Sequence, residues 1–399
     1  MVRMDIGTMP VYMLNKPDLV HTILVTRAHS VHRTGTLFDR MREVVGNGLA
    51  AAEGDLHLTQ RRLMQPALHR KQINGYITLM REHTQTIADS WQDGGIVDVD
   101  HAMADLIAGN AADAMFGQRL SPEMSGTIRR AMPVLTDNFM VRLQIPKVLE
   151  RLPLPATRRF NGALAELRQV INTIVRQRLH SDTQHGNDLV GLLLAGQVEL
   201  AQVHDEVVSV LLAGIVTTAP TLSWLFYELD RNPQVEARVL EELSTVLHDD
   251  VPLADSIGRL DYTRRAVREV LRLHPLLMVI RQVTSPFDLD GVALPAGTEL
   301  GYSPYTLHRD PRLFPEPTRL DPDRWTDERS RHFPPGTFTP FGEGRHRCIG
   351  EFFAWAELLV ALAVLLPRWR LRLAPGEVVR ELNGGHPRPS SLRMTVSTR

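Results

Sequence analysis

The chain of 399 residues contains a single cysteine, and the residues around it restrict the fold more than any other feature. Cys348 lies in the segment FGEGRHRCIG, residues 341–350. One cysteine excludes an internal disulfide and any zinc or iron–sulfur site that needs several cysteines. Gly342 and Gly344 allow a tight backbone turn before the cysteine, and Gly350 places no side chain beside its sulfur atom. The segment therefore predicts a sharp turn that presents one thiol to a flat ligand.

Charge and position favour ionisation of this thiol. An apolar helix is predicted over residues 351–366, and the amide groups and dipole of its first turn stabilise a nearby anion. Arg345, His346 and Arg347 are expected to lower the pKa of the thiol in the same direction. Two other interpretations stay open at this point. Cys348 is either a small buried hydrophobic residue without chemistry, or a bare catalytic thiolate whose histidine base the sequence does not identify.

The composition is typical of a soluble globular protein. Lys plus Arg is 45 and Asp plus Glu is 46, so the net charge is −1, which argues against a basic surface for nucleic acid. Apolar runs are shorter than the ~18–20 residues that span a bilayer, and no signal peptide is visible. We therefore expect no membrane span. The single cysteine also favours a reducing, cytoplasmic location.

The order of the predicted elements indicates a mainly α fold with minor β structure. The predicted strands lie at residues 2–6, at residues 11–14 and within residues 281–302. The segments with helical apolar spacing are residues 57–116, 160–179, 189–194, 205–229, 233–247 and 262–273. Residues 32–54 are predicted to be mostly loop, and residues 310–341 to be coil. No Gly/Ser linker divides the chain, so residues 1–399 are predicted to form one domain.

The segment around the cysteine resembles the FGxGxHxCxG pattern of the cytochrome P450 family. That resemblance implies a single P450 fold in which haem b, iron protoporphyrin IX, is buried between a long distal helix and the cysteine loop. It implies that Cys348 is the thiolate ligand of the iron, with Phe341, Gly342 and Gly350 around the haem. His346 stands where the family has a basic residue that pairs with a haem propionate. Thiolate ligation pushes electron density onto iron and favours O–O cleavage.

Glu269 and Arg272 form an ExxR pair on a predicted helix. Alone, such a pair is more simply a surface ion pair. Downstream, the segment PDRW (residues 322–325) resembles the PERF segment of the family, whose arginine joins the ExxR pair in a buried network. By this resemblance Arg324 is the third member, and Trp325 stands where the family usually has phenylalanine. Loss of one partner is expected to be costly, because it leaves a buried charge unpaired.

Three further basic residues resemble the propionate ligands of the family. His57 and Arg61 are four residues apart and share one face of a predicted helix. Arg281 begins the strand-rich segment after Pro275. Arginine forks suit carboxylates. The simpler interpretation of each residue alone is a solvated cation.

The segment AGIVTT, residues 213–218, resembles the [AG]GxxTT pattern of the distal helix. Ala213 and Gly214 leave room for O2, and the resemblance implies that Thr217, followed by Thr218, supports proton delivery. Alternatively, the Thr217 hydroxyl bonds the carbonyl group four residues back.

Val216 departs from that pattern, because most members have an acid at this position. Proline has no N–H group and its ring clashes with the carbonyl four residues earlier, so Pro220 is expected to free the Val216 carbonyl group for an ordered water. The alternative is chemistry that does not depend on ordinary O2 activation, such as peroxygenase or group-transfer chemistry.

The candidate walls of the substrate pocket are mostly apolar or small, which favours a lipophilic substrate. They are residues 36–49, Val210, Ala213, Val216, Thr217, Met278, Val279 and residues 383–386. Met278 and Val279 are equally compatible with core packing. Residues 145–155 resemble a lid of the family, and the sequence is similar to bacterial terpene-oxidising members. Since related proteins have a lead-in before the first strand, we expect a short or truncated N-terminus.

No GxGxxG fingerprint is present, so electrons must come from a partner. Arg62, Arg70, Lys71, Arg345 and Arg347 are predicted to form a basic patch for an acidic ferredoxin, itself reduced by a ferredoxin reductase. A solvated face is the alternative. We expect a monomeric monooxygenase of a hydrophobic small molecule; a haem-based sensor or binding protein is the third alternative.

Overall fold

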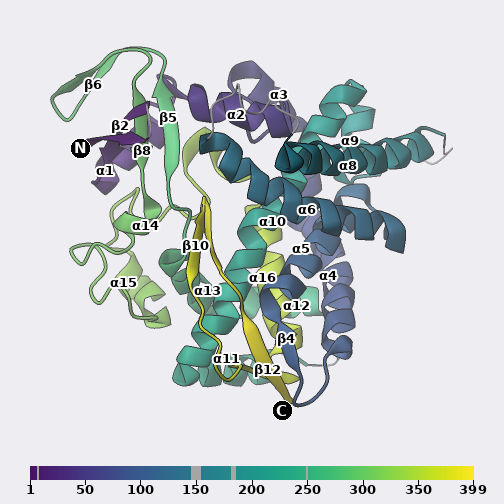
Figure 1. The fold of residues 1–399 in the computed structure, drawn as a ribbon. Coiled ribbons are helices and arrows are strands. Elements are labelled where there is room, and N and C mark those ends of the chain that lie inside the picture. Colours follow the sequence, from purple (N-terminus) through teal and green to yellow (C-terminus); the bar gives the residue numbers. More distant parts are fainter. Residues whose placement is uncertain (7–8, 145–153, 181–185, 249) are drawn as a thin grey trace.

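The computed structural model describes residues 1–6, 9–144, 154–180, 186–248 and 250–399 (Figure 1). Most of the chain forms a body of helices. Its longer helices are α2 (Thr36–Val45), α3 (Gly54–Met64), α4 (Arg70–Ser90), α5 (Val99–Phe116), α6 (Pro122–Gln144), α8 (Pro155–Leu179), α10 (Leu200–Arg231), α11 (Pro233–Val246), α13 (Asp261–Leu273) and α16 (Glu351–Leu365). Shorter helical segments are α1 (Pro17–His21), η1 (Thr22–Thr26), η2 (Gln65–Leu68), α9 (Leu189–Ala195), α12 (Leu253–Ser256), η3 (Ile257–Arg259), α14 (Pro304–Leu307), η4 (Pro322–Trp325), α15 (Asp327–Ser330) and η5 (Gly344–His346).

The strands form small sheets beside the helices. They are β1 (Val2–Ile6), β2 (Met9–Leu14), β3 (Val31–His32), β4 (Ile96–Asp98), β5 (Val279–Val283), β6 (Phe287–Leu289), β7 (Val292–Leu294), β8 (Glu299–Tyr302), β9 (Trp369–Leu373), β10 (Glu381–Gly384), β11 (His386–Pro389) and β12 (Arg393–Thr398). The largest sheet has the order β1-β2-β8-β5-β3. Only its β2–β8 pair is parallel among the described strands, with Val11 opposite Glu299. This sheet places the start of the chain beside residues 279–302.

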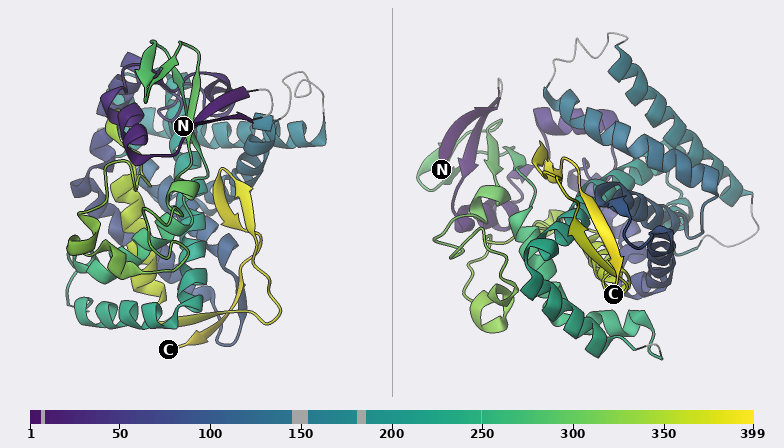
Figure 2. Two further views of the ribbon diagram at one scale, coloured as in Figure 1. Left: turned by 90° about the vertical axis from the view of Figure 1, so that its left-hand side faces the viewer. Right: turned by 60° about the horizontal axis from the view of Figure 1, so that its bottom comes forward.

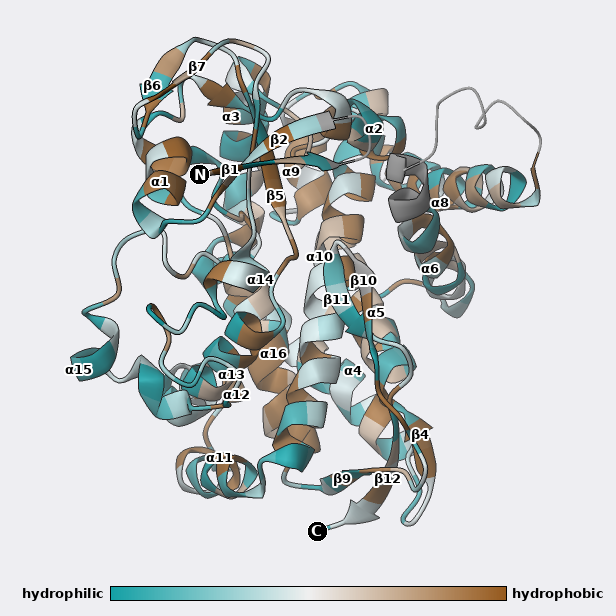
Figure 3. Cartoon of the chain, turned by 60° about the vertical axis from the view of Figure 1, so that its left-hand side comes forward, coloured by the Kyte–Doolittle hydropathy of each residue, from teal (hydrophilic) through white to brown (hydrophobic). Residues whose placement is uncertain are grey.

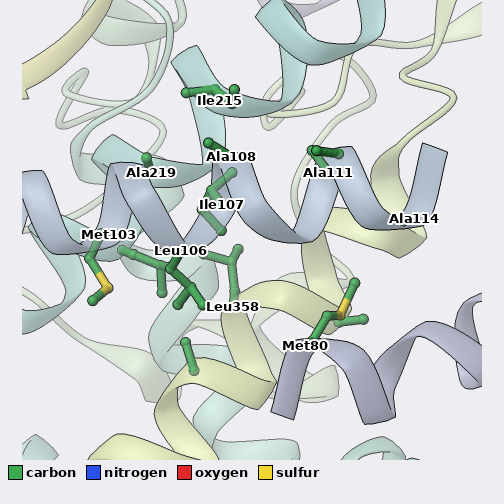
Figure 4. Packing of buried hydrophobic residues seen from close by; sticks show 14 of the residues in the cluster. Met80, Met103, Leu106, Ile107, Ala108, Ala111, Ala114, Ile215, Ala219 and Leu358 are labelled. Atoms are coloured by element: carbon green, nitrogen blue, oxygen red, sulfur yellow. The ribbon is translucent and has the colours of Figure 1, made fainter. Parts of the chain in front are cut away.

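Helix α10 lies at the centre of the helical body and packs against α5 and α16. Ala108 and Ala111 of α5 are small and buried, so the backbones of α5 and α10 can approach closely near Ile215 and Ala219 (Figure 4). Helix α16 is apolar along most of its length (Figure 3), as expected of a helix buried in a core. Helix α10 is also long and apolar enough to span a bilayer, but 72% of that window is buried in the protein.

The C-terminal strands follow the helical body. Figure 2 shows β10, β11 and β12 running along it toward the C-terminus. The indole N–H group of Trp224 on α10 donates to the carbonyl oxygen of Pro387 on β11, at 2.9 Å. The amide of Leu277 donates to the Gly385 carbonyl oxygen, also at 2.9 Å. Both contacts hold the β10–β11 turn next to α10 and to the start of β5.

The predicted fold class, mainly α with minor β, is confirmed, whereas two local predictions are wrong. Residues 32–54 are not mostly loop, since α2 occupies Thr36–Val45. Its apolar residues Phe38, Val44 and Val45 are buried, but the helix is short and bounded by Gly35 and Gly46, which conceals its period. Helix α10 begins at Leu200, five residues before the predicted start. Most of the predicted lid, residues 145–153, lies outside the described residues.

Candidate functional site

The cysteine loop is a tight turn held by backbone hydrogen bonds. The amide of Cys348 donates to the Phe341 carbonyl oxygen at 2.8 Å. Gly342 and Gly344 have φ of 69° and 67°, which side chains rarely adopt. A Cβ atom on Gly344 would also collide with the carbonyl oxygen of Leu24. At Gly350 the nearest atom to an added Cβ would be the Cys348 sulfur at 3.9 Å, so the space beside the sulfur is open.

The Cys348 side chain is exposed although it is next to the apolar helix α16. Desolvation by the surrounding protein raises the pKa of the thiol, while a hydrogen bond from the Gly350 amide opposes the rise. The expected net lowering of this pKa is therefore not found in the protein alone, because desolvation outweighs the opposing charges of Arg61 and Arg33. Arg345 and Arg347, which the sequence predicts to lower it, pair with Glu53 at 2.7 Å and with Glu351 at 2.6 Å. Coordination to a metal ion would deprotonate such a thiol outright.

Helix α10 presents small side chains to open space. Ala213 is exposed in the middle of this otherwise buried helix, and an added Cβ on Gly214 would meet no atom within 4 Å. The Thr217 hydroxyl donates to the Ala213 carbonyl oxygen at 2.8 Å, the bond expected of a helical threonine. Val216 and Thr217 are partly exposed, whereas Thr218 is buried. The face that carries Ala213 and Thr217 is thus the one open to a ligand.

Four of the predicted cation-bearing residues lie together around the cysteine loop. The rings of His57 and His346 are 4.4 Å apart, and the Arg61 guanidinium donates to the Arg347 carbonyl oxygen at 2.7 Å. Desolvation, together with nearby arginines, lowers the pKa of His57 to about 4 and that of His346 to about 3. Nε2 of His346 is buried, 3.3 Å from the Glu53 carboxylate but without a well-aligned hydrogen bond.

Arg281 is buried on β5, and burial lowers the pKa of its guanidinium. In the described part of the chain, no carboxylate lies within ion-pair distance of it. Its own neighbour provides the acceptor, because Nη1 donates to the Ile280 carbonyl oxygen at 2.7 Å.

Sequence reasoning missed one member of this group, Arg33. Its guanidinium donates to the carbonyl oxygens of Leu49 (3.3 Å), Ala50 (3.4 Å) and His346 (3.2 Å). Desolvation and repulsion by Arg281 lower its pKa to about 9. No periodicity or motif marks Arg33, so only the three-dimensional path of the chain reveals it. We call Arg33, His57, Arg61, Arg281 and His346 the cation cluster.

The carboxylate that contacts the cation cluster among the described residues is Glu53. Burial opposes its ionisation, but the nearby His346 ring, with Nε2 at 3.3 Å, and hydrogen bonds from the amides of Arg33 and Gly54 hold its pKa well below the usual range. Since Arg345 also bonds Glu53, its charge is shared. The cluster therefore retains an excess of positive charge, a suitable environment for an anionic ligand.

The ExxR pair and Arg324 form a separate, fully buried network. Nε and Nη2 of Arg272 each donate to a Glu269 oxygen at 2.8 Å. Nε of Arg324 lies 3.3 Å from the same carboxylate, which also accepts the Trp325 indole N–H group at 2.8 Å. The remaining Arg272 donors bond carbonyl oxygens; these belong to His308 (3.0 Å), Pro317 (2.5 Å) and Arg319 (3.0 Å). The predicted three-residue network is present, and the alternative of a surface ion pair is wrong.

The comparison with known proteins identifies the family. The family model described as "Cytochrome P450" matches residues 1–393. The chain belongs to the cytochrome P450 family. It is 35% identical over 384 residues to cyclooctat-9-en-7-ol 5-monooxygenase of Streptomyces melanosporofaciens, covering 94% of this chain and 83% of that protein. It is 33% identical over 408 residues to pentalenene oxygenase of Streptomyces avermitilis, covering 100% and 90%.

A solved P450 structure shows the same fold. The haem domain of cytochrome P450DA has a TM-score of 0.85 at 24% identity and covers 100% of this chain and 90% of that domain. The predicted P450 membership and monooxygenase class are confirmed, and with them haem as the cofactor.

The residues of this P450 fit that cofactor. No group of three or more His, Cys, Asp or Glu side chains suited to a metal ion occurs in the described residues, so the protein offers no metal cage of its own. It offers instead one exposed sulfur, open space at Gly214 and Gly350, and the buried, unsatisfied Nε2 of His346. A macrocycle that brings its own four nitrogen ligands and two carboxylates matches these features.

The other predicted site residues of the P450 have varied surroundings. Val210, Met278 and Val279 are partly exposed; Met278 directly precedes β5, and Val279 is its first residue. Of the predicted basic patch, Arg62, Arg70 and Lys71 are exposed, whereas Arg345 and Arg347 already have carboxylate partners. The patch is therefore less positive than the sequence predicts.

Proposed function

We propose that this P450 inserts one O2-derived oxygen atom into a cyclic terpenoid or a similarly hydrophobic metabolite. The observation that carries the proposal is the exposed Cys348 sulfur beside open space, with Ala213 and Gly214 likewise facing open space on α10. Bound haem would supply the iron at which O2 is reduced and the oxygen atom is transferred.

The cysteine loop would hold the iron, and the cation cluster would hold the propionates. Cys348 would supply the sulfur ligand, because Gly350 leaves the space beside its sulfur open. Arg33, Arg61 and Arg281 would donate to propionate oxygens, and binding two anions would offset the desolvation that lowers their pKa values. His57 and His346 would take part as donors next to them.

On α10, Thr217 would orient a water at the distal side. Its proton is directed to the Ala213 carbonyl oxygen, so the lone pairs of the hydroxyl remain free to accept a hydrogen bond. Val216 cannot carry a proton. We propose that the carbonyl group of Val216, freed by Pro220, holds a second water in its place. Pro220→Ala should then consume O2 without forming a proportional amount of product. Unchanged coupling, measured as product per O2 consumed, would reject this role.

The substrate class follows from the apolar walls and from the relatives. Val210, Val216, Met278 and Val279 offer hydrocarbon surface, which suits a ligand with few polar groups. Two relatives are named for the oxidation of cyclooctat-9-en-7-ol and of pentalenene. A cyclic hydrocarbon or alcohol of that kind is the proposed substrate.

Electrons would arrive at the surface outside the cysteine loop. Phe352, the second residue of α16, is 54% exposed, and Arg62, Arg70 and Lys71 are exposed on α3 and α4. Helix α16 packs against α4, and an exposed apolar residue together with exposed cations on these elements suits an acidic ferredoxin reduced by its reductase. Lys71→Glu should slow reduction of the haem iron and weaken the salt dependence of its rate, while Arg3→Glu on β1 should do neither.

We also propose that the protein is a cytoplasmic monomer. Cell fractionation tests the location, and analytical sedimentation tests the oligomeric state.

The first test is the absorption spectrum of the reduced, CO-bound protein. A thiolate-type band in the wild-type protein and its loss in Cys348→Ser are expected, and a haem-free or histidine-type protein would overturn the proposal. Labelled O2 then tests the reaction, because the product should contain one labelled oxygen atom. A specific observation favours one alternative: with Val216 at the acid position, product from peroxide without electron donors would indicate a peroxygenase.

A further inference from the structure

The segment between α2 and α3, residues 46–53, is bonded to one face of α10. Three of its backbone amides each donate to a side chain of that helix. The pairs are Asn47 with Asp205 (2.8 Å), Leu49 with Glu206 (2.8 Å) and Ala50 with Ser209 (3.1 Å). Gly48 makes this approach possible, because a Cβ atom there would collide with the Asp205 carbonyl oxygen and the Ser209 side chain.

Glu206 is the buried member of this row. Its side chain is 0% exposed, and its carboxylate accepts from the Leu49 amide and from Nε2 of Gln202, the latter at 2.8 Å. Burial raises its pKa to about 7. A carboxyl group in this position costs stability when it ionises, and it is the side chain that holds the Leu49 amide on α10.

Leu49 is also bonded by Arg33, through its carbonyl group. Nη1 of Arg33 donates to the Leu49 carbonyl oxygen, and Nη2 donates to the carbonyl oxygen of His346. His346 is two residues before Cys348 in the chain. The contacts therefore run from Glu206 on α10 through the backbone of one residue, Leu49, and through the Arg33 guanidinium to the cysteine loop.

We propose that Glu206 is a positioning residue: through Leu49 and Arg33 it sets the position of the cysteine loop and couples that loop to α10. The inference rests on the proposed function, since it takes Cys348 as the iron ligand. Displacement of α10 or of residues 46–53 by a ligand would then alter the geometry of the thiolate without direct contact. Asp205 does not share this role, because it holds the amide of Asn47, and the carbonyl oxygens that Arg33 bonds in this segment are those of Leu49 and Ala50.

Three variants distinguish this positioning role from a general contribution to folding. Glu206→Met fills the same buried volume without an acceptor; Glu206→Gln keeps an acceptor oxygen for Leu49. Asp205→Ala is the matched control, since it frees another amide of the same segment, that of Asn47, from the same helix. Because apolar replacement of a buried acid avoids its desolvation cost, Glu206→Met is expected to fold.

The measurements are the transfer of haem to apomyoglobin, the thiolate-type band of the reduced CO complex and amide hydrogen exchange at residues 344–349. In Glu206→Met, haem loss should be about tenfold faster, as expected for one lost hydrogen bond to a charged group. The thiolate-type band should also decay sooner and the loop amides exchange faster. Glu206→Gln should restore wild-type values, and Asp205→Ala should not depart from them.

Equal behaviour of Glu206→Met and Asp205→Ala would overturn the inference, as would failure of Glu206→Met to fold, which would indicate a purely structural role. If the wild-type protein itself lacks the thiolate-type band, the proposed function fails instead. The two failures are thus distinguishable.

Discussion

Two arginines of this protein are both buried, yet one is neutralised by the protein and the other is not. Arg272 is 0% exposed, and the carboxylate of Glu269 and three carbonyl oxygens surround its guanidinium. Arg281 is 9% exposed. Among the described residues no carboxylate lies within ion-pair distance of its guanidinium, which donates to the Ile280 carbonyl oxygen. The charge of Arg272 is paired within the protein, whereas the guanidinium of Arg281 can still pair with a bound anion.

The presence or absence of a carboxylate partner therefore distinguishes a structural network from a binding site, which burial alone does not. Buried charges are costly unless they are paired. The network around Glu269 avoids that cost within the chain. The cation cluster does not, and the depressed pKa values of Arg33, Arg281 and His57 record the cost. The propionates of haem are anions that would remove it.

Arg272→Met should produce the largest effect on stability. The change leaves the buried Glu269 carboxylate without its two main bonds and three carbonyl oxygens without donors, for which ~3–5 kcal/mol of destabilisation is expected. Denaturant unfolding of the haem-free protein measures it. Arg319→Met is the control, because Arg319 is an exposed partner of Glu316 and such pairs contribute at most ~1 kcal/mol. Equal effects in the two variants would remove the distinction drawn above.

Arg281→Met should give the opposite pattern. Because the substitution removes an unpaired buried charge, the haem-free protein should lose no stability or gain up to ~1 kcal/mol. Haem affinity should fall about tenfold or more, as expected for a lost charge-assisted bond to a propionate. Titration with haem and denaturant unfolding measure the two quantities. A haem-free protein as unstable as Arg272→Met would assign Arg281 to the structural core.

Trp325→Phe sharpens the description of the network. The indole N–H group donates to Oε1 of Glu269, and phenylalanine fills most of the same volume without a donor. A loss of ~1–3 kcal/mol in the free energy of unfolding is expected. Trp91→Phe is the control, since it removes a buried indole that packs edge-on against Trp369, outside the network. If both variants lose the same amount, the hydrogen bond adds nothing beyond volume.

The sequence predicts what depends on local spacing. The glycines around Cys348 and the pair Glu269–Arg272 lie within a few residues of one another, so turn chemistry and helical period reveal them. The contacts of Arg33 do not follow from spacing, because its partner His346 is 313 residues away. Glu53 likewise neutralises Arg345 across 292 residues. The bond from the Trp325 indole to Glu269 does not follow from spacing either, since it depends on how η4 packs against α13.

The smallest expected effect is on the pH dependence of stability, and it should differ between the haem-free and the haem-bound protein. The pKa of His57 is lowered to about 4 by desolvation and neighbouring arginines, against about 6.5 in an unfolded chain. The unfolded state thus binds more protons between these values, so His57 makes stability fall as pH decreases from about 6.5 toward 4. In haem-free His57→Gln this part of the acid sensitivity should disappear. The denaturation midpoint measured at several pH values between these limits tests it. Propionates would raise the pKa of His57, so the difference between His57→Gln and the wild-type protein should be smaller when haem is bound. An identical difference in both forms would mean that His57 does not face the propionates.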